Sequence, residues 1–177
     1  MRIFSIFLLV FPLLFFGCFQ DKKKEGEERY RFVTQQNEYF EIKSNFSFLS
    51  LFHKKKLIKK NILVFFLDID NPTCFEYFQV LENLQRGYPD LEVLAISTRK
   101  LAKQEFIDFY TKYKVSFLLL NPLEAKSILK DFSKKFAEKR EIVLPFLVLY
   151  DKTQKMYQYY EGAVPQEMFM FDLKNLN

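Results

Sequence analysis

Hydrophobic and polar positions follow two patterns along the chain that predict strands. Tyr39 to Phe52 alternates apolar and polar residues, which predicts a peripheral β-hairpin. Ile62 to Leu67 is a continuous apolar run, which is typical of a strand buried on both faces of a sheet. Further strands are predicted at Leu91–Ile96, Val115–Leu120, Glu141–Tyr150 and Met156–Tyr160. A turn between the last two makes them a second hairpin.

Apolar residues at helical spacing predict helices between these strands. Asn71 is placed as the N-cap of the first helix, and Pro72 is placed as its first residue. Asn121 and Pro122 repeat this arrangement, with Glu124 in position for a capping box. Two other helices are predicted at Leu101–Tyr113 and around Met168–Leu173. The alternation of strands and helices predicts an α/β fold with a central mixed β-sheet flanked by helices.

The first residues of the chain have the outline of a signal peptide. Arg2 is followed by the uncharged run from Ile3 to Phe16. This run is shorter than the roughly 20 apolar residues that a helix needs to span a bilayer, so we expect no permanent transmembrane anchor. The segment Leu14 to Cys18 resembles the lipobox of bacterial lipoproteins. That resemblance implies that residues 1–17 are removed and that Cys18 carries a lipid; the alternative is an ordinary cleaved signal with an incidental cysteine.

A charged linker and a single domain are predicted to follow Cys18. Asp21 to Arg29 contains no apolar residue, and residues 18–36 are interpreted as a solvated, lipid-anchored linker. Residues 37–177 have the length of one domain. The chain is 49% hydrophobic and 19% aromatic, which is enough apolar surface for a substantial core. The lipoprotein resemblance implies that this domain lies in the bacterial envelope, on the periplasmic side of a membrane.

Charge and composition argue against several classes of function. The net charge of +5 is small against 28% charged residues, and the lysines are scattered, so we expect no nucleic-acid partner. The densest basic run, Lys54–Lys56 with Lys59 and Lys60, is interpreted as a solvated turn in preference to a surface for anionic lipid. His53 is the only histidine and has no second ligand at metal-binding spacing. No metal or other cofactor is therefore expected, and four glycines without a Walker or dinucleotide motif predict no phosphate loop.

Two stretches resemble the thioredoxin-like superfamily, in particular its TlpA and cytochrome-maturation type envelope members. One is Leu63–Phe66 leading to Asn71–Cys74, and the other is Val143–Asp151 followed by Glu161-Gly162-Ala163. The resemblance extends from Tyr39 to Leu176 and implies a thioredoxin-like fold. It further implies that the peptide bond Leu144-Pro145 is cis and that it packs beside the start of the helix near Cys74.

The same alignment shows that the usual Cys-x-x-Cys motif is missing. Asn71 stands where the nucleophilic cysteine is found in the family, and Cys74 corresponds to the second, resolving cysteine. Phe65 replaces a buried polar or acidic group, and Asp70 replaces the tryptophan that usually precedes the motif. Disulfide exchange by a two-cysteine cycle needs an attacking thiolate and a resolving thiol. These departures therefore argue against that cycle.

Cys74 has two interpretations. A thiol in the first turn of a helix has free backbone N–H groups and the helix dipole to favour its thiolate, so Cys74 is a candidate catalytic monothiol. It also shares the apolar helix face with Phe78 and Leu81, which predicts an inert thiol in the core. The core interpretation is favoured. A peroxiredoxin-like peroxidase is a weaker alternative, because Asn71 stands in place of its threonine and no arginine lies within Val143–Tyr150.

The family resemblance also implies a place for polypeptide binding. In the family, the backbone of the residue before the cis-proline pairs with an extended chain, which requires no cysteine. The candidate substrate-binding residues are Asn71, Pro72, Thr73, Leu144 and Pro145. The favoured hypothesis is a membrane-anchored, redox-inactive module that binds an envelope polypeptide. The alternative from another functional class is a monothiol thiol-disulfide oxidoreductase acting through Cys74.

Overall fold

The structure, a computed structural model, describes residues 26–136 and 141–176. The predicted signal peptide and the predicted lipid attachment site, Cys18, lie outside these residues. The strands in the described part are β1 (Glu28–Val33), β2 (Tyr39–Ser44), β3 (Leu49–His53), β4 (Lys56–Leu57), β5 (Asn61–Leu67), β6 (Leu91–Ser97), β7 (Leu118–Pro122), β8 (Phe146–Tyr150) and β9 (Met156–Glu161). The helices are α1 (Pro72–Gly87), α2 (Lys103–Tyr113), α3 (Ile128–Phe136) and α4 (Gln166–Asn175).

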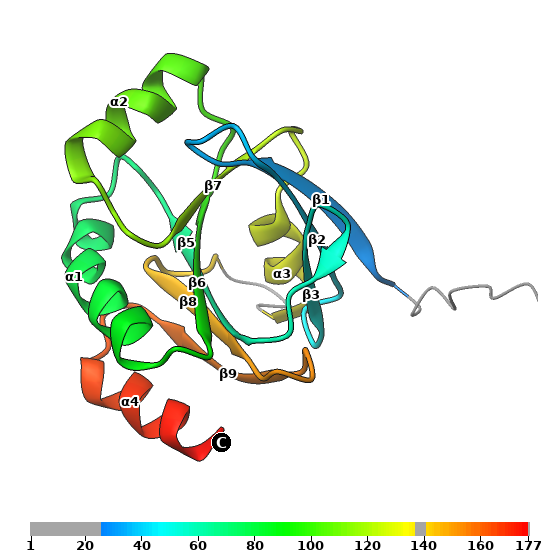
Figure 1. Cartoon of the computed structure of the whole chain (residues 1–177), viewed down its shortest axis with the longest axis vertical. Coiled ribbons are helices and arrows are strands. Elements are labelled where there is room, and N and C mark those ends of the chain that lie inside the picture. Colours follow the sequence, from blue (N-terminus) through cyan, green and yellow to red (C-terminus); the bar gives the residue numbers. More distant parts are fainter. Residues whose placement is uncertain (1–25, 137–140, 177) are drawn as a thin grey trace, which may run out of the picture.

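All of these strands belong to one mixed sheet in the order β4-β3-β2-β1-β7-β6-β5-β8-β9 (Figure 1). The central pairs β5–β6 and β6–β7 are parallel. The flanking pairs are antiparallel, including β5–β8 and the two hairpins β2–β3 and β8–β9. The structure thus confirms the predicted α/β fold with a mixed central sheet and helices on its faces.

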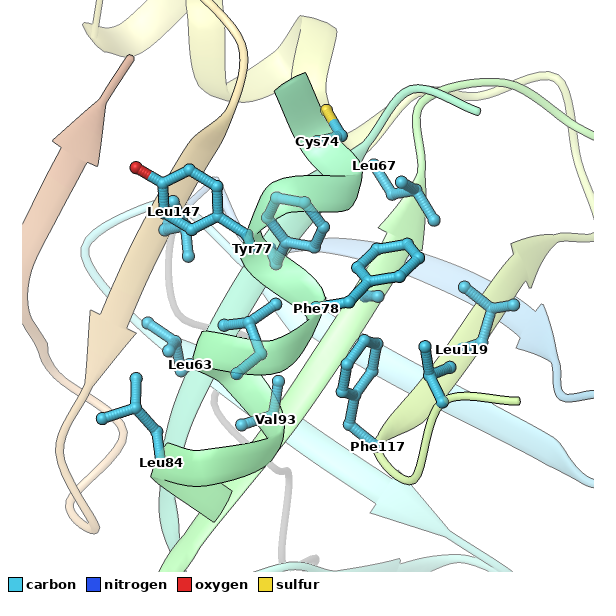
Figure 2. Packing of buried hydrophobic residues seen from close by; sticks show 14 of the residues in the cluster. Leu63, Leu67, Cys74, Tyr77, Phe78, Leu84, Val93, Phe117, Leu119 and Leu147 are labelled. Carbon is cyan, nitrogen blue, oxygen red and sulfur yellow. The ribbon is translucent and has the colours of Figure 1, made fainter. Parts of the chain in front are cut away.

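The continuous apolar run in β5 is explained by burial on both faces of the sheet. Leu63, Phe65 and Leu67 belong to one apolar cluster with the buried face of α1, which Figure 2 shows from close by. Ile62 and Phe66 belong to a second cluster that includes the β2–β3 hairpin and residues of α3. All described members of both clusters lie between residues 30 and 176.

The predicted boundary between linker and domain is wrong, because β1 lies inside residues 18–36. β1 pairs with β2 along its whole length and with the end of β7. Tyr30 and Phe32 are buried in the second cluster, whereas Arg29 and Arg31 point to solvent. In the sequence, the charged residues of the outer face make β1 look like part of the charged linker, although the two aromatic residues between them belong to the core. The folded part therefore includes residues 28–33, which lie before the predicted boundary at residue 37.

The predicted helix start at Asn121-Pro122 is also wrong. These two residues end β7, and α3 begins only at Ile128. The Asn121 side chain is buried and joins the loop before α2: its Oδ1 accepts from Leu101 N at 2.9 Å and its Nδ2 donates to Leu101 O at 3.0 Å. Glu124 forms no capping box; its carboxylate accepts from Arg31 Nε at 2.6 Å. The Asn121 amide and the Glu124 carboxylate, which a helix cap would use, instead form hydrogen bonds to distant parts of the chain.

The lysine run contains a turn, as predicted. Lys54 and Lys55 connect β3 to β4, and both adopt positive φ angles of 49° and 65°. Both side chains are exposed.

Candidate functional site

The candidate site lies at the start of α1, just beyond the end of β5. Asn71 is the N-cap as predicted: its Oδ1 accepts from Thr73 N at 3.0 Å, and its backbone O accepts from Cys74 N at 3.1 Å. Pro72 occupies the first helical turn, where its missing N–H costs no hydrogen bond. Asn71 therefore serves as a helix cap at the position where a nucleophilic thiol would be expected.

Cys74 is fully buried and is the free cysteine of the described residues. Figure 2 shows its side chain in the apolar cluster, near the end of β5 and one turn of helix before Tyr77 and Phe78. Burial raises the pKa of the Cys74 thiol, and this effect outweighs a hydrogen bond from the Asp68 backbone that lowers it. A catalytic thiol needs the opposite shift together with access to solvent. Phe65, at the position of the family's buried acid, is also fully buried.

The predicted cis peptide at Leu144-Pro145 is confirmed. Pro145 directly precedes β8, whose first residue Phe146 pairs with Phe66 near the end of β5. The cis-proline and the start of α1 therefore lie at the same edge of the sheet. Leu144 packs against the apolar cluster that contains Cys74, so the structure brings the predicted substrate-binding residues together at this edge.

A tyrosine that the sequence analysis did not single out ties the two halves of this edge together. The Tyr77 hydroxyl, from α1, donates to Val164 O at 3.0 Å and accepts from Val164 N, in the loop after β9. That loop is also joined to the cis-proline, because Gly162 N donates to Pro145 O at 2.9 Å. A tyrosine on an otherwise apolar helix face is the signal that would have identified it, since a buried tyrosine hydroxyl needs a partner.

The surface of this edge is mainly apolar, with a cluster of charged side chains beside it. Ile69, Leu144 and Val164 are partly buried and pack on the cluster beneath, and Val143 is 55% exposed. At the rim, the Arg99 guanidinium bonds to Glu105 Oε1 at 2.6 Å and to Asp70 Oδ2 at 3.3 Å. Asp70 therefore belongs to a surface ion pair. Chemically, the edge offers backbone groups and apolar contacts, without an accessible thiol among the described residues.

Among residues 26–136 and 141–176, no group of three or more His, Cys, Asp or Glu side chains is arranged to hold a metal ion. None of the helices in those ranges is long and apolar enough to cross a membrane.

Comparison with known proteins gives similarity of fold without close similarity of sequence. No family model matches the chain, and no curated protein matches it. Among solved structures, the thioredoxin domain of a thiol-disulfide oxidoreductase from Bacteroides vulgatus superposes with a TM-score of 0.59 at 13% identity, over 85% of this chain and 94% of that one. The exposed lipoprotein thioredoxin of Streptococcus pneumoniae gives 0.58 at 12% identity, over 84% and 100%. A secreted Mycobacterium tuberculosis disulfide oxidoreductase homologous to E. coli DsbE gives 0.55 at 16% identity, over 83% and 96%.

Proposed function

We propose that this chain, whose domain has a thioredoxin-like fold, is a redox-inactive polypeptide-binding module of the bacterial envelope, held to a membrane by lipid on Cys18. The observation that carries the proposal is the chemistry at the start of α1. Asn71 uses its side chain as a helix cap, and Cys74 is buried with a raised pKa. Neither group can open a substrate disulfide without a local rearrangement, because the reaction requires an accessible thiolate.

The cis-proline edge supports polypeptide binding independently of any thiol. β8 pairs with β5 on one side and with β9 on the other from Phe146 onward. Main-chain groups are therefore available for an added strand only before Phe146, at residues 143 and 144. Exposed Val143 and half-buried Leu144 would flank such a strand with apolar contacts. The Val143 N–H is held by Glu161 Oε1 at 2.8 Å, so a bound chain would have to displace that carboxylate.

The envelope location is supported by the N-terminal sequence and by the nature of similar structures. The run from Ile3 to Phe16, followed by Gly17-Cys18, resembles a lipoprotein signal. One similar structure is described as an exposed lipoprotein, and another is described as secreted. The mass of the N-terminal peptide of the mature protein tests this part: an acylated Cys18 is expected, and a start downstream of Cys18 would refute it.

Site-specific crosslinking tests the binding function. A photo-reactive amino acid at Val143, introduced into the full chain, is expected to capture a polypeptide in the intact envelope. The same group at Ile107, an exposed residue on α2, is the matched control and should capture none at that yield. Capture at Val143 should survive Cys74→Ser, because no mixed disulfide is involved.

An insulin-reduction assay distinguishes this function from the monothiol alternative. The wild-type protein is expected to give no turnover above the background of the reductant. Turnover that disappears in Cys74→Ser, or capture at Val143 that disappears in the same variant, would refute the proposal. Either result would favour an oxidoreductase that draws its second thiol from solution.

A further inference from the structure

The outer face of β1–β3 forms a basic cleft that polypeptide binding at the cis-proline edge does not use. The cleft has a volume of about 540 Å³. Figure 1 shows these strands on the side of the molecule away from α1 and α4. On β1 and β2 the charged residues that line the cleft alternate with buried ones, so these two strands turn their charged side chains outward together. Five cations line it, and we name them the basic face: Arg29, Arg31, Lys43, Lys54 and Lys55.

The basic face carries more positive charge than its neighbours neutralise. Three carboxylates accompany it: Glu41 lies 3.5 Å from Arg29, Glu38 lies 3.2 Å from Lys54, and Glu124 pairs with Arg31. Five cations against three carboxylates leave a local net charge of +2. Within the described residues, neither Lys43 nor Lys55 has a carboxylate within ion-pair distance.

Two of these cations oppose each other directly across the strands. Arg29 of β1 is the register partner of Lys43 of β2. Like charges in this position destabilise an antiparallel pair, and an anion between them removes the cost. Glu41 offsets part of this repulsion at Arg29, which leaves Lys43 as the cation of the pair that can meet an external anion.

Aromatic side chains lie among the cations. Tyr39 lines the cleft and is 63% exposed, and Lys43 Nζ lies 5.0 Å from the centre of the Phe52 ring. Aromatic rings with a polar end, together with long cationic side chains, are typical of the headgroup region of a bilayer. The combination fits a lipid surface better than a single small anion.

The position of β1 in the chain allows this face to reach the membrane to which we propose Cys18 is attached. β1 begins at Glu28, ten residues after Cys18, and an extended chain of that length spans at most roughly 35 Å. We propose that the basic face docks on the headgroups of anionic phospholipids in the membrane to which the chain is anchored. This inference rests on the lipid anchor proposed above and adds an orientation to it.

A single tryptophan makes the docking measurable, because the chain has none of its own. The full acylated protein carrying Tyr39→Trp is reconstituted into vesicles of phosphatidylcholine with brominated acyl chains, with or without phosphatidylglycerol. Quenching of Trp fluorescence is expected to be several-fold greater when phosphatidylglycerol is present, and to fall as salt shortens the Debye length. Phe171→Trp, on α4 and 67% exposed, is the control reporter and should show no such dependence.

Charge variants provide a second measurement in the Tyr39→Trp background. Lys43→Gln with Lys55→Gln should abolish most of the dependence on phosphatidylglycerol. Lys152→Gln with Lys174→Gln changes the net charge equally at exposed positions elsewhere and should leave it intact. Thermal melts of both pairs should match the parent protein, since all four side chains lie outside the core clusters.

The failure of the docking can be distinguished from the failure of the anchor. An acylated Tyr39→Trp protein whose fluorescence ignores lipid charge, or whose two lysine pairs act alike, would refute the docking alone. An unmodified Cys18 in the mature protein would refute the anchor. If polyglutamate quenches or shifts the emission of the Tyr39→Trp protein through Lys43 and Lys55 while anionic vesicles do not, the face binds an acidic polypeptide and the proposal is wrong.

Discussion

Restoring a second cysteine is the sharpest perturbation that the structure suggests. Asn71→Cys places a thiol at the N-cap of α1, three residues before Cys74, where the family motif has its nucleophile. The substitution removes the hydrogen bond from Thr73 N to Asn71 Oδ1, and losing such a cap costs about 1 kcal/mol. A disulfide between residues 71 and 74 closes a four-residue loop, which the chain-entropy relation values at roughly 2 kcal/mol.

The reduced form of the variant should therefore be less stable than the wild type, and the oxidised form should be more stable. The reduced form is expected to be less stable by about 1 kcal/mol and the oxidised form more stable by a similar amount. For a domain of this size, the separation corresponds to roughly 6 °C in melting temperature. Asn71→Ser keeps an N-cap acceptor without a thiol and is the matched control, with no difference between reducing and oxidising conditions.

Activity should follow the disulfide. The reduced variant is expected to reduce insulin, because backbone N–H groups of the first turn favour a thiolate at position 71 and Cys74 lies where a resolving thiol belongs. Thiol titration after mild oxidation provides the decisive check. Two free thiols remaining at positions 71 and 74 would show that the start of α1 lacks the family geometry, and the argument from the missing cysteine would fail.

Three further substitutions test the site thiol and the buried hydrogen bonds of the fold. Cys74→Ser puts a hydroxyl into an apolar cluster and should lower the free energy of unfolding by about 1 kcal/mol or more in urea melts. Polypeptide capture should be unchanged. An unchanged free energy of unfolding would contradict the core role of the thiol. Asn121→Ala leaves the buried backbone N–H and C=O of Leu101 unpaired, so the free energy of unfolding should fall by roughly 3 kcal/mol. A decrease too small to measure would mean that water replaces the amide. Burial raises the pKa of Tyr150, whose hydroxyl donates to Phe46 O at 2.9 Å, so the folded state keeps a proton that an unfolded tyrosine loses above pH ~10. The stability from this group is complete below that pH and declines above it; Tyr150→Phe should make the alkaline decline shallower, and equal slopes would refute the assignment.

The elements that the sequence predicted well are those whose pattern is local and unambiguous. β5 was visible as a continuous apolar run, and the start of α1 was visible because Asn71 and Pro72 are followed at once by apolar residues at helical spacing. The cis peptide at Leu144-Pro145 followed from the family resemblance, which its surrounding residues support.

The elements that were missed are decided by contacts between distant parts of the chain. Asn121-Pro122 has the same local signature as Asn71-Pro72, but its amide is taken by the backbone of Leu101 and the strand continues through Pro122. β1 is short and half of its residues are charged, and its place depends on pairing with β2 and β7. No local pattern reports such pairing.

The sequence predicted which residues form the candidate site, but not the contacts between distant segments that hold it together. The loss of the nucleophile at Asn71 is evident from the alignment alone. The role of Tyr77 depends on the loop after β9 folding back onto α1, and the basic face depends on β1, β2 and the β3–β4 turn meeting on one surface. Sequence separation hid both arrangements.

The attachment of the N-terminal segment to β1 has a mechanical consequence. β1 lies between two antiparallel neighbours, and all six of its residues pair with β2. Tension applied at Glu28 acts along the axis of the strand, so these pairs bear the load together in shear and do not open one after another. The same tension applied through α4 would act on its side-chain packing and on the hydrogen bonds that Tyr88 and Tyr160 donate to it, because that helix lies outside the sheet. If the N-terminal segment is anchored as we propose, a pull from that end meets the part of the fold best able to resist it, and a polypeptide bound at the cis-proline edge would be held against that pull.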